Sequence, residues 1–193
     1  MMRVVVPVAI VLVIAIGGGA ASAWYALRTV QGFNALRVGE WTAYPDRGTP
    51  RSDPYSKARF AREAELPLGI GEGLTFVAER DAAGQPLLAQ CSYRIEGAVP
   101  ASRLWTLYAS RGDLEPLDTN LREKGLHSLQ MVRRIDDSVA IRATPNVSAG
   151  NWLRTSGAGP MSFVLTFYDP PSVSGVEASD FELPRIYRDG CDA

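Results

Sequence analysis

The sequence is poor in the residues from which most metal and catalytic sites are built. It has one histidine, His127, and two cysteines among its 193 residues. A metal centre needs several His, Cys or carboxylate ligands together, and an oxidised cysteine pair would not be available as ligands. We therefore expect no metal site and no cofactor.

The chain also lacks an excess of charge of either sign. There are 20 Lys and Arg against 21 Asp and Glu, and no basic run is longer than two residues. Proteins that bind nucleic acid usually carry a basic patch or stripe. This balance disfavours nucleic acid as a partner, and the 18 Gly and 13 Pro indicate a turn-rich β protein.

Charge is missing altogether from Val4 to Leu27. A run of that length is enough to cross a hydrocarbon layer about 30 Å thick. Trp24 and Tyr25, near its end, suit the membrane–water interface. The pattern predicts that residues 1–28 form a transmembrane anchor.

A second interpretation of this segment remains open. Ala21-Ser22-Ala23 is typical of a signal peptidase site, and cleavage after Ala23 would release a soluble protein. We favour the uncleaved anchor, because the apolar run continues beyond this site. Either fate predicts a location outside the cytoplasm, and the anchor predicts a single-pass protein of the inner (plasma) membrane with its C-terminal domain in the periplasm.

The two cysteines, Cys91 and Cys191, form an even pair in a chain that we expect to be exported. Disulfides persist in such oxidising compartments. We predict a Cys91–Cys191 disulfide, which would close a loop of about 100 residues. Two unrelated buried thiols are the alternative.

After the anchor, we interpret residues 29–51 as a spacer, within which Trp41 is expected to pack on the edge of the domain. Residues 52–193 are predicted to form one folded domain. It begins with a helix over residues 52–65, in which Ser52 or Asp53 can cap the first turn and Pro54 is tolerated.

Short segments with strand character and turn signals follow the helix. The clearest, residues 161–168, alternates Met, Phe, Leu and Phe with more polar residues and ends at Asp-Pro-Pro, which predicts a strand with one face on the core. Other predicted strands cover residues 74–79, 91–96, 104–109, 129–135 and 139–143. Such spacing predicts a mainly β fold, an antiparallel β-sandwich or jelly-roll-like domain.

Several segments together carry a family resemblance. They are Tyr93-Arg94-Ile95-Glu96-Gly97, residues 103–108, Gly150-Asn151-Trp152-Leu153, residues 163–168 and residues 183–186. The chain resembles the bacterial domain of unknown function 1214 over roughly residues 53 to 188. The resemblance implies a sandwich fold and no established catalytic residues. The domain often forms the C-terminal half of a two-domain protein, which implies a separately encoded companion-domain protein as a possible partner.

Candidate ligand-binding residues gather at the polar, aromatic corner of the chain. Asn151 and Trp152 could present an amide and an aromatic platform to a ligand, with Trp105 and Arg154 nearby. The structural interpretation is favoured: Trp152 closes one end of the sandwich and Asn151 bonds loop backbone.

A catalytic interpretation rests on few residues. Ser156 and His127 could form a triad with Asp136 or Asp137, although any chain with one histidine supplies such a candidate. We therefore predict a non-catalytic envelope protein that binds a ligand or a partner. The alternative is a periplasmic hydrolase or carbohydrate-active enzyme.

Overall fold

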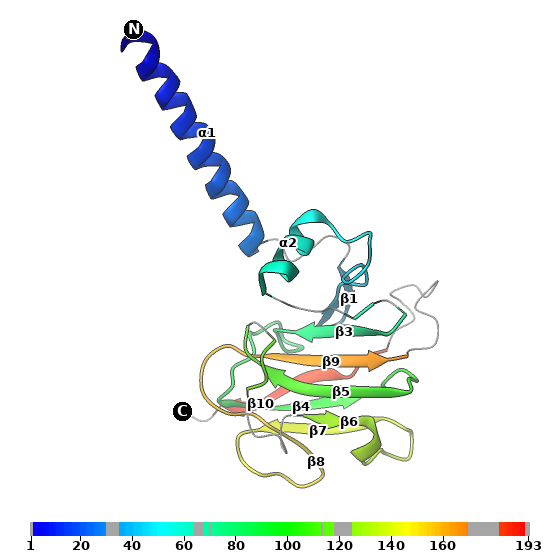
Figure 1. Ribbon diagram of the computed structural model, residues 1–193. Coiled ribbons are helices and arrows are strands. Elements are labelled where there is room, and N and C mark those ends of the chain that lie inside the picture. The colour runs from blue at the N-terminus through cyan, green and yellow to red at the C-terminus, as the bar shows by residue number, and fades with distance from the viewer. Residues whose placement is uncertain are drawn as a thin grey trace. The chain divides into compact units, whose positions relative to one another are not determined.

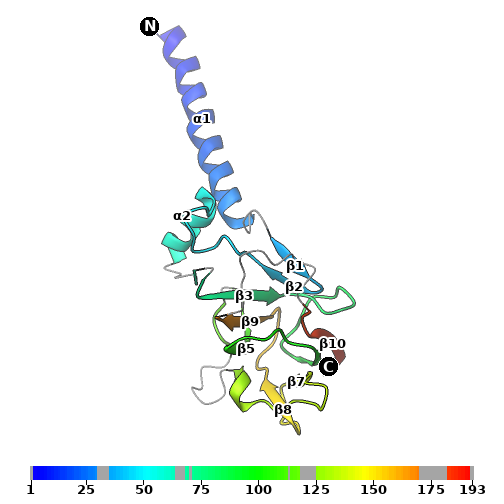
Figure 2. The same cartoon turned by 90° about the vertical axis from the view of Figure 1, so that its right-hand side faces the viewer.

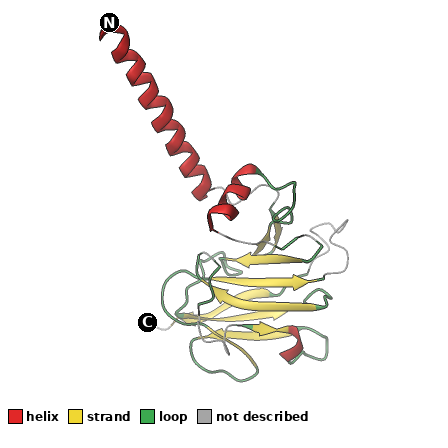
Figure 3. Ribbon diagram, in the orientation of Figure 1, coloured by secondary structure: helices red, strands yellow, loops and turns green. Residues whose placement is uncertain are grey.

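The structure is a computed structural model that describes residues 2–29, 35–63, 68–69, 71–112, 114–117, 125–169 and 182–191. Its contacts divide the chain into two units, residues 1–33 with 46–67, and residues 34–45 with 68–193. The two α-helices belong to the first unit and the strands to the second (Figures 1 and 3). The domain boundary expected at residue 52 stays a prediction.

Helix α1 spans Met2–Thr29. Within it, Val4–Tyr25 has a mean hydropathy of 2.6 and no part of this stretch is buried by the protein. By length and composition this stretch can cross a membrane. It corresponds to the apolar helix that the sequence predicts. A signal sequence has the same properties, so retention of the helix in a membrane stays a prediction.

Helix α2 spans Pro54–Glu63, and Asp53 caps it. The Asp53 carboxylate accepts hydrogen bonds from the backbone amides of Tyr55 and Ser56, both at 3.0 Å. The Ser56 hydroxyl also donates to this carboxylate and is the main cause that lowers the pKa of Asp53. The helix lies where the sequence predicts it, and the expected end at Glu65 lies outside the described residues.

We expect Asp53→Ala to speed amide hydrogen exchange in α2. The free energy of a lost N-cap, about 1 kcal/mol, corresponds to roughly fivefold faster exchange.

Because the pKa of Asp53 is lowered in the fold, the cap is fully present above the ordinary value of 3.8 and is lost as pH falls through the lowered value. Exchange measured by mass spectrometry on the full chain checks this. Asp53→Ser should keep most of the protection, and equal exchange in wild type and Asp53→Ala at neutral pH would contradict the assignment.

Two sheets make up the second unit (Figure 2). In the six-stranded sheet the order is β1 (Leu36–Val38), β2 (Trp41–Ala43), β3 (Gly73–Ala78), β9 (Ser162–Tyr168), β5 (Leu104–Ser110) and β6 (Leu126–His127). In the four-stranded sheet it is β10 (Arg185–Cys191), β4 (Cys91–Gly97), β7 (Val139–Thr144) and β8 (Asn151–Arg154). All pairings are antiparallel except that of β7 with β8, which is parallel.

The inner faces of the two sheets share one hydrophobic core. Tyr93 from the four-stranded sheet meets Phe163 from the six-stranded sheet edge to face, with ring centroids 5.8 Å apart. The largest fully buried side chains come from both sheets: Trp41, Phe76, Tyr93, Ile95, Trp105, Ile141, Phe163, Leu165 and Phe167. This confirms the predicted mainly β, sandwich-like fold.

Strand β9 is buried on both faces, whereas its alternating sequence predicts one buried face. The strand lies inside the six-stranded sheet, between β3 and β5, so neighbouring side chains flank its outer face from both sides. The hydroxyl groups of Thr166 and Thr75 are 3.1 Å apart there, and those of Ser162 and Ser110 are 2.9 Å apart. Small hydroxyl residues can be buried at these positions because they satisfy one another.

The segment interpreted as a spacer contains two strands, so that interpretation is wrong for residues 36–43. They form a hairpin that extends the six-stranded sheet through β3. Trp41 is completely buried and donates its indole N–H to the carbonyl oxygen of Pro184 at 2.7 Å. The sequence correctly indicated that Trp41 packs on the domain, but not the strand that carries it.

The strand predicted over residues 129–135 is also wrong. A 3₁₀ helix occupies Ser128–Gln130, and the side chains of Leu129, Val132 and Ile135 are exposed. Their apolar character made the segment look like a strand, but only a single antiparallel bridge, Arg133 to Val139, is present. A turn does precede β7, and in it Asp137 has a φ of 63°.

The predicted disulfide is present between Cys91 and Cys191, which lie opposite each other on β4 and β10. It joins residues 100 positions apart and fixes the last described strand to the sheet. Among the described residues there are no free cysteines.

Candidate functional site

Asn151, the first residue of β8, uses its whole amide group to hold a neighbouring segment. Its Oδ1 accepts from the backbone N–H of Val132 at 2.8 Å, and its Nδ2 donates to the carbonyl oxygens of Val132 and Ala140 at 2.7 and 3.0 Å. An amide engaged in this way has no donor left for a ligand. Asn151 therefore positions the segment before β7, as its structural interpretation expects.

The other candidates of the corner are separated by the fold. Trp152 and Arg154 are on β8, and the Trp152 indole N–H bonds to the carbonyl and hydroxyl oxygens of Thr144 at 3.2 and 3.1 Å. Trp105 is on β5 of the other sheet and is 1% exposed. Its indole N–H is buried with no partner among the described residues. Trp105 thus lies in the core, whereas Asn151, Trp152 and Arg154 lie on β8, and a ligand-binding role for these four residues stays a prediction.

The residues considered for a triad are not joined by hydrogen bonds in the described parts of the chain. The Ser156 hydroxyl donates to the carbonyl oxygen of Leu117 at 3.4 Å, and Nδ1 of His127 is buried without a partner. Asp136 accepts from the hydroxyl and backbone N–H of Ser138, and these bonds lower its pKa. An aspartate engaged in its own turn does not orient an imidazole.

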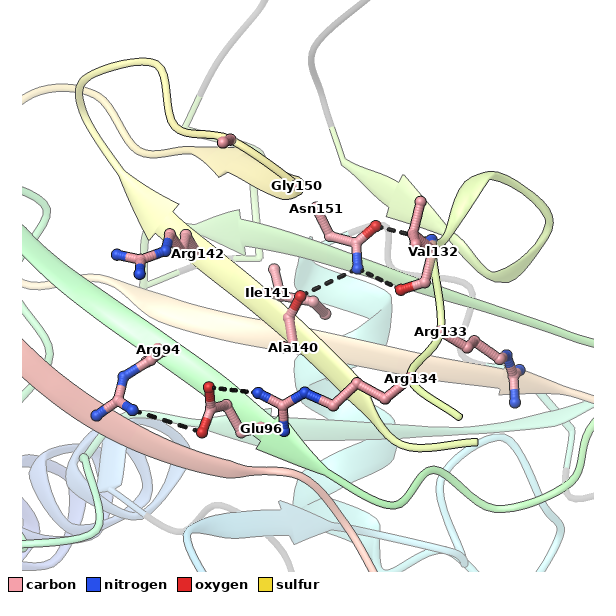
Figure 4. Close-up of a pocket in the computed structure, with 11 residues that line it drawn as sticks. Arg94, Glu96, Val132, Arg133, Arg134, Ala140, Ile141, Arg142, Gly150 and Asn151 are labelled. Carbon is pink, nitrogen blue, oxygen red and sulfur yellow. Dashed lines mark hydrogen bonds and ion pairs between the residues drawn. The ribbon is translucent and has the colours of Figure 1, made fainter. Parts of the chain in front are cut away.

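A cleft of about 320 Å³ lies beside Asn151, on the four-stranded sheet. Figure 4 shows its lining residues, which come from β4, β7, the start of β8 and the segment that Asn151 holds. Four of them are arginines, whereas only one carries a carboxylate: Arg94, Arg133, Arg134, Arg142 and Glu96. The volume is at the lower end of the range for small-molecule sites.

The sheet register places two of these arginines side by side. Arg94 of β4 and Arg142 of β7 are paired positions in the antiparallel ladder, on the face opposite to the buried Tyr93 and Ile141. Like charges directly opposite one another on a sheet are destabilising. The repulsion between the two arginines must therefore be offset by other contacts.

Three of the four arginines have acidic partners. Figure 4 shows Glu96 between Arg94 and Arg134, with N–O distances of 3.5 and 3.0 Å. Arg94 also donates to Asp189 at 3.1 Å, and that hydrogen bond is the main cause of its raised pKa. Arg133 pairs with Asp137, with the two charged groups 2.9 Å apart.

Arg142 is different, because it has no hydrogen bond or ion pair within the described part of the chain. Its side chain is exposed and lies on the same face of the sheet as Trp152, its partner in the parallel ladder. A free guanidinium presents five N–H donors in a planar fork that matches the oxygens of carboxylate or phosphate. Chemically, the cleft can bind an anion.

The sequence reasoning missed these arginines. Arg94 and Arg142 stand at polar positions of two predicted strands. The sequence therefore indicated that each side chain faces away from the core. Their juxtaposition depends on the β4–β7 register, which no local pattern specifies. Among the described residues there is no group of three or more His, Cys, Asp or Glu side chains that could hold a metal ion.

The fold and the cleft place the chain in the class of β-sandwich proteins, with an apolar N-terminal helix and an arginine-rich cleft on one sheet. The chain belongs to the family described as "Protein of unknown function (DUF1214)", whose sequence profile matches residues 72–172. This confirms the resemblance carried by the Asn-Trp-Leu corner and the flanking strands. No curated protein gives a significant match.

Two solved structures are similar in fold. The VPA0106 protein from Vibrio parahaemolyticus superimposes with a TM-score of 0.59 at 14% identity, over 91% of this chain and 43% of that one. An uncharacterised protein from Burkholderia cenocepacia has a TM-score of 0.46 at 15% identity, over 92% of this chain and 42% of that one. The chain thus spans less than half the length of the solved structures that it matches.

Proposed function

We propose that this chain is a single-pass membrane protein that displays its β-sandwich in the periplasm and acts there as a non-catalytic binding protein. The observation that carries the proposal is the Cys91–Cys191 disulfide in a domain that follows an apolar helix. Disulfides of this kind are maintained in oxidising compartments and are rare in the cytosol. The helix α1, retained as an anchor in the inner membrane, would keep the domain at the membrane.

The binding role is supported by the cleft on the four-stranded sheet. Its arginines contribute little to folding, because ion pairs between exposed side chains are worth only about 0–1 kcal/mol. Arg94 and Arg134 are respectively 40% and 51% exposed in their pairs with Glu96. Arg142, which has no ion pair in the described part of the chain, is better explained by a ligand or a partner.

A companion protein is the partner that the comparisons favour. The solved structure from Vibrio parahaemolyticus is more than twice as long as the part that this chain matches. A separate protein could supply what the remainder of such a chain supplies. Co-purification from membranes solubilised in mild detergent tests this, and isolation of the chain alone would count against it.

The topology makes a direct prediction. With alkaline phosphatase fused after Ala193, we expect enzyme activity, and with green fluorescent protein at the same position we expect no fluorescence, because only the phosphatase folds in the periplasm. The intact mass of the membrane-bound chain should include α1 and not begin at Trp24. The opposite reporter pattern would overturn the location.

The matched control for topology is Val11→Arg combined with Ile14→Arg in the middle of α1. Each arginine at the centre of a membrane helix costs about 2.5–3.5 kcal/mol on insertion scales. The double variant should lose phosphatase activity if α1 directs export. Unchanged activity would show that another segment does so.

A further inference from the structure

The cleft on the four-stranded sheet combines features that point to the class of its ligand. Its lining carries four arginines, and one of them, Arg142, has no partner among the described residues. Glu96 stands beside the same space and holds Arg94 and Arg134. The cleft is therefore positive. The Arg142 guanidinium is free, Arg134 pairs with Glu96, and Arg94 pairs with both Glu96 and Asp189.

We propose that this cleft binds the phosphate or carboxylate group of a small soluble organic molecule, with Arg142 as the residue that contacts the anion. The inference deepens the proposed function, since it names the ligand class of the same site. The volume of about 320 Å³ accommodates a small molecule. Phosphate and carboxylate are both recognised by the planar fork of arginine, so the shared chemistry is an oxyanion.

Asn151 acts in this site as a positioning residue. It holds the backbone of Val132 through two hydrogen bonds, and Arg133 and Arg134 follow directly. The same amide bonds Ala140, two residues before Arg142 on β7. One side chain thus ties together two of the three segments that present arginines to the cleft, and Gly150 precedes it with a φ of +85° that favours glycine.

Glu96 makes the proposal sharply testable, because it competes with the ligand. Its carboxylate pairs with Arg94 and Arg134 at 3.5 and 3.0 Å. Replacing it by Gln removes a negative charge from the cleft and releases the Arg134 guanidinium, while Arg94 keeps its partner Asp189. A site for anions should then bind more tightly, whereas a purely structural ion-pair network would only lose stability.

The experiment measures binding to the full chain in a non-ionic detergent at low salt, by titration calorimetry. The probes are glucose 6-phosphate and glucuronate, with glucose as the neutral analogue. We expect saturable binding of at least one anionic probe and none of glucose. The two anionic probes distinguish phosphate from carboxylate as the preferred group.

The variants give opposite results if the proposal holds. Arg142→Gln should weaken the affinity about tenfold, since a hydrogen bond to a charged group is worth about that factor. Glu96→Gln should strengthen it several-fold. Arg37→Gln is the matched control, because Arg37 is an exposed arginine on β1 of the other sheet and its loss changes the net charge equally.

Three outcomes would overturn the proposal. They are no saturable binding of either anion, binding that Arg142→Gln leaves unchanged, and an equal loss in Arg37→Gln, which would indicate non-specific attraction. Urea unfolding of each variant establishes that it is folded. Because the solubilised protein is used, failure here leaves the topology result intact, and failure of the reporter fusions leaves this binding test intact.

Discussion

The double variant Cys91→Ala/Cys191→Ala is expected to unfold at much lower urea concentration than the oxidised wild type. The disulfide closes a loop between residues 100 positions apart. In the chain-entropy model a loop of that length stabilises the fold by about 4–5 kcal/mol, which corresponds to a fall in Tm on the order of 10 °C for a protein of this size. Tryptophan fluorescence of the full chain in non-ionic detergent follows the transition.

The reductant provides the control for this variant. Wild type treated with dithiothreitol should unfold at nearly the same urea concentration as the double variant, and the variant itself should not respond to the reductant. Part of any remaining difference reflects the loss of Cys91, which is completely buried. Equal stability of the variant and the oxidised wild type would show that the cross-link contributes nothing to this fold.

The second large effect is expected from Trp41→Ala. Trp41 is completely buried between the sheets and is the only described link from β2 to the carbonyl of Pro184, just before β10. Truncating a buried tryptophan costs about 3–5 kcal/mol, from lost burial and from the cavity that remains. Urea unfolding followed by the fluorescence of Trp105 and Trp152 gives the free energy of unfolding.

Trp41→Phe separates packing from hydrogen bonding at the same position. It keeps an aromatic ring but removes the indole N–H, which leaves the carbonyl of Pro184 without that donor. The expected cost is about 1–3 kcal/mol, less than that of the alanine variant. If residues 36–43 were only a spacer, both variants would be as stable as wild type.

The elements that the sequence predicted well are those with strong local patterns. The apolar helix, the cap at Asp53 and the alternating strand β4 each follow from residues close together in the chain. The disulfide was predictable for a different reason, since only one pairing exists for two cysteines. Local chemistry was sufficient in each of these cases.

The errors arose where the environment overrides local pattern. Residues 129–135 are apolar enough for a strand, yet Leu129, Val132 and Ile135 are exposed in a loop that Asn151 holds. Residues 36–43 are a short segment of mixed polar and apolar residues, whose pattern does not predict strands. They form two strands because β2 pairs with β3. β-propensity is strongly context-dependent, which explains both errors.

The sequence by itself determined the apolar N-terminal helix, the mainly β character, the family and the one possible disulfide, because each depends on composition, local periodicity or the identity of a few residues. Only the tertiary structure decided that Trp41 belongs to the core and that Arg94 lies opposite Arg142 beside Glu96. These contacts join segments far apart in the chain. They depend on strand order and register, which the pairing of whole strands selects.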